Sequence, residues 1–328
     1  MDLTIIIVSY NEAEYIERAV ESCLRQKFSG TMEIVIGDDG SSDGSIEIVK
    51  RLSQEHSIIS FFVTENRNDG EIIPAVRASN VIKRALSKAR GRYLSILSAD
   101  DYYCTFDRFE KAISFLDAPS SKRYSATCTD FSRVYGNERQ ENVISNAPSW
   151  RSLLIAKYYF HLSTFIFRRE VYEKGLLFDR YCSDVGMFYA ICKCGKIKKI
   201  NEVTFCHFQR NDSISHSIDK FETSVHQMIF LQDVYNKRFF LFSSLCRVFR
   251  ELRMVFKGRQ QLNNSKFQVL ADYCSNYNNN FLGWIKKYDS LSFINKIKFK
   301  LLYFKAFCSF MGFRGINLFY KVFTHGNK

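Results

Sequence analysis

Residues 3–45 read LTIIIVSYNEAEYIERAVESCLRQKFSGTMEIVIGDDGSSDGS, and this stretch decides the fold. Two short runs rich in β-branched residues, Thr4–Val8 and Glu33–Gly37, lack the alternation of a half-exposed strand. Such runs are typical of strands that are buried on both faces of a parallel sheet. Between them, apolar side chains recur three or four residues apart over residues 12–26, which predicts an amphipathic helix. The stretch therefore predicts a β-α-β unit.

The same alternation continues along the first hundred residues. Further strands are expected at Ile58–Val63 and Tyr93–Leu97, and further helices from residue 42 or 43 through Leu52 and over Ala78–Ala89. This order predicts an α/β fold with a doubly wound, right-handed and mostly parallel sheet. The rhythm then changes. Helices are expected at residues 107–116 and 184–194, and strands at residues 124–135, 164–167 and 198–208.

The composition is that of a globular protein with an excess of positive charge. Of 328 residues, 46% are hydrophobic and 25% are charged, which excludes a wholly disordered chain. The formal net charge of +13 favours a polyanionic partner, which could be nucleic acid, an anionic membrane or a phosphorylated substrate. The first apolar run lacks the features of a signal peptide, so we expect a cytoplasmic protein whose ten cysteines are mainly buried thiols rather than zinc ligands.

Polar residues follow three of the expected strands. In an open parallel sheet, ligands bind beyond the carboxyl ends of the strands, so residues 9–12, 38–45 and 98–101 are expected to meet in one site. A turn followed by a helix would also explain the second of these strings. The adjacent carboxylates of Asp100 and Asp101 repel each other unless a cation neutralises them. A hard divalent ion beside a diphosphate leaving group would use such a pair.

Several common catalytic motifs are absent from the sequence. There is no GxxxxGK[ST] phosphate loop and no GxGxxG after the first expected strand, which disfavours P-loop NTPases and ordinary Rossmann dehydrogenases. There is no GxSxG nucleophile elbow either, which disfavours the simplest hydrolase interpretation.

Three strings together carry a resemblance to a known family: VSYNE at residues 8–12, DDGSSDGS at residues 38–45 and ARGRYLSILSADDYY at residues 89–103. Their order and spacing resemble those of family 2 glycosyltransferases, which have a GT-A fold, over roughly residues 1–217. The resemblance implies a nucleotide-sugar-binding half at residues 1–103 and an acceptor half at residues 104–217. Residues 218–328 are then a basic, aromatic-rich helical extension.

The resemblance implies transfer of a sugar from a nucleotide diphosphate donor, with inversion at the anomeric carbon and help from Mg²⁺ or Mn²⁺. It places Asp100 at the metal-binding aspartate of the DxD motif, with Asp101 adjacent, while Ser98 replaces the first acidic residue of that motif. Arg77 would point toward the diphosphate. The residues that would line the nucleotide pocket or contact the base and ribose are Ser9, Tyr10, Asn11, Glu12, Asp38 and Asp39.

The second half of the expected domain contains the other candidate residues. Asp184 opens a stretch that resembles the one carrying the family's general base, although an acidic residue at a helix N-terminus also has a purely structural use. His161 lies in a stretch that resembles the strand bordering the acceptor site. His207 and Arg210 lie where relatives have a Tyr-Arg-x-His stretch, with Arg210 in place of the usual His. They are assigned to the acceptor or diphosphate side.

The carboxyl-terminal region suggests where the protein acts. Residues 296–313 form an apolar stretch with a narrow basic stripe, which could lie on an anionic membrane or dock on protein. Together with the family resemblance, this tail leads us to expect a lipid-linked saccharide acceptor, no nucleic-acid partner and a peripheral location at the inner face of the cell membrane. The resemblance implies a nucleotide-sugar donor, for which a UDP-sugar is the first candidate, and synthesis of a surface polysaccharide such as O-antigen or capsule. The alternatives are a nucleotidyltransferase and a decayed module that binds membrane or nucleic acid.

Overall fold

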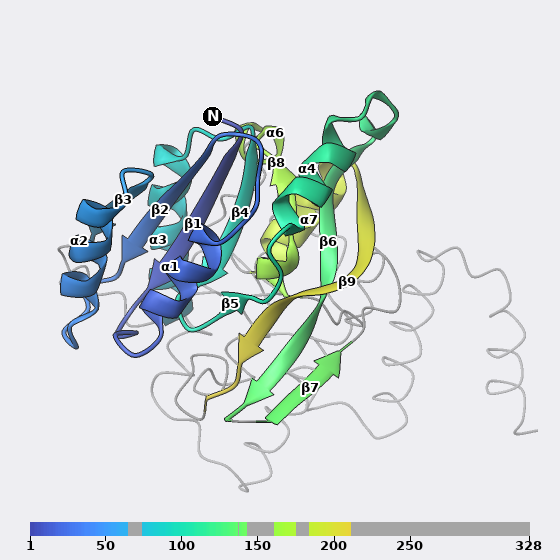
Figure 1. Ribbon diagram of the computed structural model, residues 1–328. Coiled ribbons are helices and arrows are strands. Elements are labelled where there is room, and N and C mark those ends of the chain that lie inside the picture. Colours follow the sequence, from blue (N-terminus) through green and yellow to red (C-terminus); the bar gives the residue numbers. More distant parts are fainter. Residues whose placement is uncertain (65–73, 137, 143–160, 175–183, 211–328) are drawn as a thin grey trace, which may run out of the picture. The chain divides into compact units, whose positions relative to one another are not determined.

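The computed structural model describes residues 1–64, 74–136, 138–142, 161–174 and 184–210 (Figure 1). Within these ranges, the side chains of residues 74–76, 138–142, 184, 185 and 189 are not described. The chain divides into two compact units, Met1–Arg247 and Val248–Lys328. The second unit, the expected boundary at residues 217 and 218 and the basic stretch at residues 296–313 all lie outside the described residues.

One mixed sheet forms the centre of the described part of the chain. Its nine strands follow the order β3-β2-β1-β4-β8-β6-β9-β5, and β7 pairs with β6. The first four strands in this order are parallel to one another, as expected from the sequence. Their bounds are Leu3–Ser9 for β1, Met32–Asp38 for β2, Ile59–Val63 for β3 and Tyr93–Ser98 for β4.

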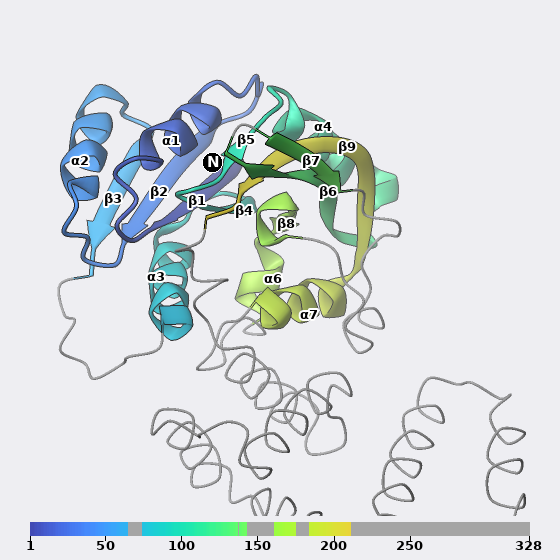
Figure 2. The same ribbon diagram turned by 90° about the horizontal axis from the view of Figure 1, so that it is seen from below.

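Helices cover both faces of the parallel part of the sheet. Helices α1 (Ile16–Leu24) and α2 (Ser45–Glu55) lie on one face, and α3 (Pro74–Lys88) lies on the other (Figure 2). In β1, Ile5 and Ile7 belong to the apolar cluster that contains α1, whereas Ile6 belongs to the cluster that contains α3. All three side chains are fully buried. Burial on both faces explains the continuous apolar run.

The second half of the described chain extends the sheet. Strand β8 is antiparallel to β4 and β6, whereas β6 and β9 are parallel to each other. The short β5 pairs with the end of β9, so that Tyr102 lies opposite Cys206. The remaining bounds are Tyr102–Tyr103 for β5, Arg108–Asp117 for α4, Pro119–Ser121 for the 3₁₀ turn η1, Tyr124–Tyr135 for β6, Glu138–Asn142 for β7, Leu162–Thr164 for the 3₁₀ turn η2, Ile166–Arg168 for β8, Glu170–Glu173 for α6, Asp184–Cys194 for α7 and Lys196–Phe208 for β9.

Most expected elements are confirmed, although several bounds differ by a few residues and the short helix α6 and the two 3₁₀ turns were not expected. Helix α3 begins at Pro74, four residues before the expected Ala78, because proline is well suited to the first turn of a helix. Strands β5 and β7 were not expected, because two aromatic residues and the polar run ERQEN carry no strand periodicity of their own. No helix among the described residues is both long enough and apolar enough to cross a membrane.

Candidate active site

The candidate site lies at the carboxyl ends of β1, β2 and β4, which are neighbours in the sheet. The strand register sets Ser9 opposite Asp38. Beyond the strands, the N–H of Asp39 donates to the carbonyl of Ser9 (2.9 Å), and the N–H of Ala99 donates to the carbonyl of Val8 (3.0 Å). The three polar strand ends therefore meet at one edge of the sheet.

Side-chain hydrogen bonds hold the loop after β1 to the loop after β2. Asn11, whose φ is 53°, accepts a hydrogen bond from the N–H of Ser42 (2.9 Å), and its own N–H donates to Oγ of Ser41 (2.8 Å). The N–H of Glu12 donates to Oγ of Ser45 (2.8 Å). Part of the polar string after β2 thus shapes these loops, which explains why short polar residues occur there.

The two carboxylates that end β2 have different partners. Asp38 is 1% exposed, and its two oxygens accept hydrogen bonds from the N–H and the Oγ of Ser41, each 2.7 Å long. Asp39 instead forms an ion pair of 2.5 Å with Arg77, whose guanidinium lies 5.0 Å from the ring centre of Tyr10. Arg77 therefore contacts both Asp39 and Tyr10.

Asp100 and Asp101 follow β4 and are adjacent in the chain, but their surroundings differ. Asp101 is 0% exposed, and its Oδ1 accepts hydrogen bonds from the N–H of Phe208 (2.8 Å) and from Nδ1 of His207 (3.1 Å). Its Oδ2 is buried and has no hydrogen-bond partner among the described residues. The Asp100 side chain is 14% exposed, and burial together with the charge of Asp101 raises its pKa to about 6. Asp100 is therefore the member of the pair that solvent can reach.

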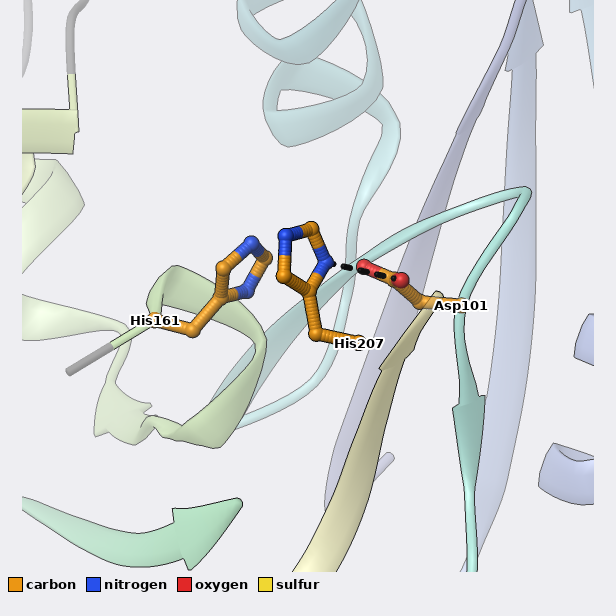
Figure 3. A group of neighbouring side chains, drawn as sticks. All are labelled: Asp101, His161 and His207. Atoms are coloured by element: carbon orange, nitrogen blue, oxygen red, sulfur yellow. Dashed lines mark hydrogen bonds and ion pairs between the residues drawn. The ribbon is translucent and has the colours of Figure 1, made fainter. Parts of the chain in front are cut away.

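His207 and His161 pair behind Asp101, with ring centres 4.5 Å apart (Figure 3). The N–H of Ser163 donates to Nδ1 of His161 (3.3 Å), and the ring of His161 also stacks on Phe205 at 4.9 Å. Burial lowers the pKa of His161 to about 4, so this imidazole is neutral at neutral pH. For His207, burial acts in the same direction, but the hydrogen bond and charge of Asp101 prevail and raise the pKa.

Arg210 joins the loop after β1 to the end of β4. Its guanidinium donates two hydrogen bonds of 2.8 Å to the carboxylate of Glu12, and it lies 3.7 Å from Oδ2 of Asp100. The guanidinium also lies 4.7 Å from the ring centre of Tyr15. Because Arg210 follows β9, the pairing of β9 with β5 brings this distant residue to the aspartates.

Two further arginines that the sequence analysis did not select support the site. Arg18 of α1 donates to the carbonyl of Asp100 (3.0 Å), and its guanidinium lies 4.5 Å from the ring centre of Tyr102. Arg108 of α4 is 1% exposed and donates to the carbonyls of Ser163 (3.1 Å) and Thr164 (3.3 Å), in the turn that follows His161. No local pattern marks either arginine, because each role depends on contacts between distant segments.

The residues beyond β4 fit a divalent cation. One ligand atom from each of Asp101, His161 and His207 lies within 4.8 Å of those of the other two. The buried Oδ2 of Asp101 supplies a carboxylate oxygen that no described group neutralises, and Asp100 adds a second carboxylate that solvent can reach. Carboxylate oxygens suit Mg²⁺ and Mn²⁺, whereas imidazole nitrogens suit zinc, copper, iron and nickel better. The two aspartates are therefore the ligands that fit the expected Mg²⁺ or Mn²⁺.

Asp184, the expected general base, is the first residue of α7. Its side chain lies outside the described side chains, so its direction relative to Asp100 stays a prediction. Ser98, in the first position of the DxD motif, is the last residue of β4. Ser9 is 1% exposed, at the end of β1.

Comparison with known proteins identifies relatives along much of the chain. The sequence model of "Glycosyl transferase family 2" matches residues 4–176. An uncharacterized glycosyltransferase of Mycoplasma pneumoniae, the MG025 homolog, is 24% identical over 206 residues, which are 58% of this chain and 64% of the relative. Chondroitin synthase of Escherichia coli is 27% identical over 217 residues, which are 62% of this chain and 28% of that protein. The chain thus spans less than two thirds of the length of these curated relatives.

Solved structures share the fold. S. aureus TarS 1-349 in complex with UDP-GlcNAc matches with a TM-score of 0.58 and 16% identity, over 83% of this chain and 80% of that one. The mannosyltransferase PcManGT from Pyrobaculum calidifontis in complex with GDP-Man and Mn²⁺ matches with a TM-score of 0.53 and 15% identity, over 87% and 83% of the two chains. The expected GT-A-like fold is confirmed.

Proposed function

Because this chain belongs to glycosyl transferase family 2, we propose that it transfers a sugar from a nucleotide diphosphate sugar to a hydroxyl group of a saccharide acceptor. The observation that carries the proposal is the group at the end of β4. There, the largely buried carboxylate of Asp100 lies beside Asp101, His207 and Arg210. Carboxylates, imidazole and guanidinium gathered at the carboxyl edge of a parallel sheet suit a phosphorylated ligand and its counter-ion.

The donor would bind across the ends of β1, β2 and β4. In this proposal Ser9, Tyr10, Asn11 and Glu12 line the nucleotide pocket, and Asp39 contacts the base or ribose with Arg77 nearby. Asp38 supports the loop through Ser41 and reaches the donor only if that pairing opens. A UDP-sugar is the first candidate, since TarS has been solved in complex with UDP-GlcNAc.

A divalent cation, Mg²⁺ or Mn²⁺, would be held by Asp100, which has Asp101 and His207 among its charged neighbours. Asp101 and His207 also form, with His161, a group whose ligand atoms lie close enough to share a metal ion. When bound, it would neutralise the diphosphate as the sugar leaves. The solved structure of PcManGT contains Mn²⁺ with GDP-Man, which supports the assignment of a metal here. Within the chain, Asp101 orients His207 through Nδ1 and so leaves the other ring nitrogen as a possible ligand.

Asp184 would act as the general base that deprotonates the acceptor hydroxyl. A single displacement with inversion requires this base on the face of the sugar opposite the diphosphate. Asp184 is the first residue of α7. This position supports the role, because a helix N-terminus favours the ionised carboxylate that a general base requires.

The acceptor side of the proposal rests on the sequence. In this proposal the acceptor is a lipid-linked saccharide, and residues 296–313 contact an anionic membrane surface. Synthesis of O-antigen or capsule is a setting that would explain the excess of basic residues. The cell compartment in this proposal is the cytoplasmic face of the membrane.

The proposal is tested by titrating the full chain with a panel of UDP-, GDP- and dTDP-sugars in the presence of Mn²⁺ and following binding by calorimetry. We expect one nucleotide class to bind and its diphosphate to compete. The bound donor is then incubated with candidate acceptors, and the anomeric configuration of the product is read by NMR. Failure of all donors to bind would overturn the proposed function, and a retained configuration would overturn the single displacement.

A further inference from the structure

Asp100 already has a positively charged neighbour within the protein. The guanidinium of Arg210 lies 3.7 Å from Oδ2 of Asp100 and makes two hydrogen bonds to Glu12. The side chains of all three residues are between 12% and 14% exposed, so the group is largely shielded from water. Shielding strengthens the interaction of charges at this separation.

A divalent ion bound to Asp100 would therefore meet Arg210 at close range. Such an ion lies about 2.1 Å from the oxygen that it binds, and Oδ2 of Asp100 lies only 3.7 Å from the guanidinium. The two cations would repel each other in a site with little water. The pair with Glu12 leaves the guanidinium 3.7 Å from Asp100. Asp100 can therefore hold the metal well only when a further anion neutralises Arg210 or draws it away from Asp100.

A nucleotide diphosphate is an anion that suits Arg210. Guanidinium groups bind phosphate oxygens through two parallel hydrogen bonds, in the same manner as the Arg210 pair with Glu12. Glu12 belongs to the loop after β1, which is expected to line the nucleotide pocket. Arg210 therefore lies between Asp100 and the loop that is expected to bind the nucleotide.

We propose that Arg210 is the resident counter-cation of Asp100, and that it opposes divalent metal binding until the donor diphosphate binds the guanidinium. Metal and nucleotide then bind with positive coupling. The diphosphate neutralises the guanidinium that repels the metal, and the metal replaces Arg210 as the counter-ion of Asp100 and so frees the guanidinium for the diphosphate. By linkage, the nucleotide strengthens metal binding by the same factor by which the metal strengthens nucleotide binding. This inference rests on the proposed function, since it takes the donor to be a nucleotide diphosphate. Glu12 is a positioning residue that holds Arg210 partly away from Asp100.

The test is a titration of the full chain with Mn²⁺ at pH 7.5, with and without UDP, in which EPR measures the free ion and calorimetry measures the heat. In the unaltered protein, we expect UDP to lower the Kd for Mn²⁺ by about tenfold or more, on the scale of one charge interaction near a protein surface. Arg210→Met should bind Mn²⁺ alone about tenfold more tightly, and UDP should lower its Kd for Mn²⁺ by a smaller factor than in the unaltered protein. Arg25→Ala, which removes an exposed arginine paired with Glu21, is the matched control and should behave as the unaltered protein.

Glu12→Gln gives a prediction of opposite sign. Without the glutamate charge, Arg210 should pair more fully with Asp100, so the affinity for Mn²⁺ alone should fall. A general loosening of the site would move both variants in the same direction. Circular dichroism checks that each variant is folded.

The proposal is overturned if folded Arg210→Met binds Mn²⁺ no more tightly than the unaltered protein, or if both variants shift metal affinity in the same direction. The proposed function fails separately. If the unaltered protein binds Mn²⁺ but no nucleotide of any base, the donor assignment is wrong, while the effect of Arg210→Met on Mn²⁺ alone still tests the counter-cation.

Discussion

Replacing Asp100 with asparagine is expected to stabilise the folded protein at neutral pH. Burial and the adjacent charge of Asp101 raise the pKa of Asp100 from 3.8 to about 6. Folding therefore favours the protonated form of Asp100. The stability that this form gives the folded protein is fully present below pH 3.8 and is lost as the pH rises through 6. At about 1.4 kcal/mol per pKa unit, the charged form costs about 3 kcal/mol at pH 8, and asparagine avoids that cost.

The assay is urea unfolding followed by far-UV circular dichroism at pH 4, 6 and 8. The difference in unfolding free energy between Asp100→Asn and the unaltered protein should grow from near zero at pH 4 to about 2–3 kcal/mol at pH 8. Asp117→Asn is the control. Burial opposes the shift there, but hydrogen bonds from Tyr93 and Arg92 lower the pKa of Asp117, so its removal should destabilise at pH 8. A difference for Asp100→Asn that is negative, or that does not change with pH, would refute the reasoning.

Three other substitutions test separate parts of the account. Asp184→Asn should reduce sugar transfer by at least about a thousandfold while the calorimetric Kd for the donor changes little, and near-normal turnover would remove its role as base. Arg108→Met should lower the unfolding free energy by about 1–3 kcal/mol, because the carbonyls of Ser163 and Thr164 lose their donors, and an unchanged urea midpoint would contradict that role. Gly37→Ala should cost about 1–3 kcal/mol, because a Cβ there would lie 2.5 Å from Cγ1 of Val81 in α3; a thermal melt that shows no loss would mean that α3 can shift freely.

The first hundred residues could be predicted well because their information is local. Each apolar run without alternation specifies a strand buried on both faces. In the segments between these runs, apolar side chains recur three or four residues apart, which specifies the covering helices. The parallel order then follows from the alternation of strands and helices. The predictions were weakest at β5 and β7, where two aromatic residues and one polar run become strands only because β9 and β6 offer them partners.

The polar strand ends show how far the sequence alone determined the site. It identified residues 9–12, 38–45 and 98–101 as neighbours, because the carboxyl ends of adjacent parallel strands meet at one edge. It did not distinguish Asp38, which is occupied by Ser41, from Asp39, which pairs with Arg77. Nor could it separate a buried Asp101 from a reachable Asp100.

Only the tertiary structure decided which charges meet. Arg210 lies 198 residues from Glu12 in sequence, and His207 lies 106 residues from Asp101. These contacts arise because the end of β9 pairs with β5, which directly follows the two aspartates in the chain. The sequence determined the chemical types at the site, since strand and turn patterns depend on near neighbours. Their protonation and pairing depend on burial and on distances through space, which no stretch of residues encodes by itself.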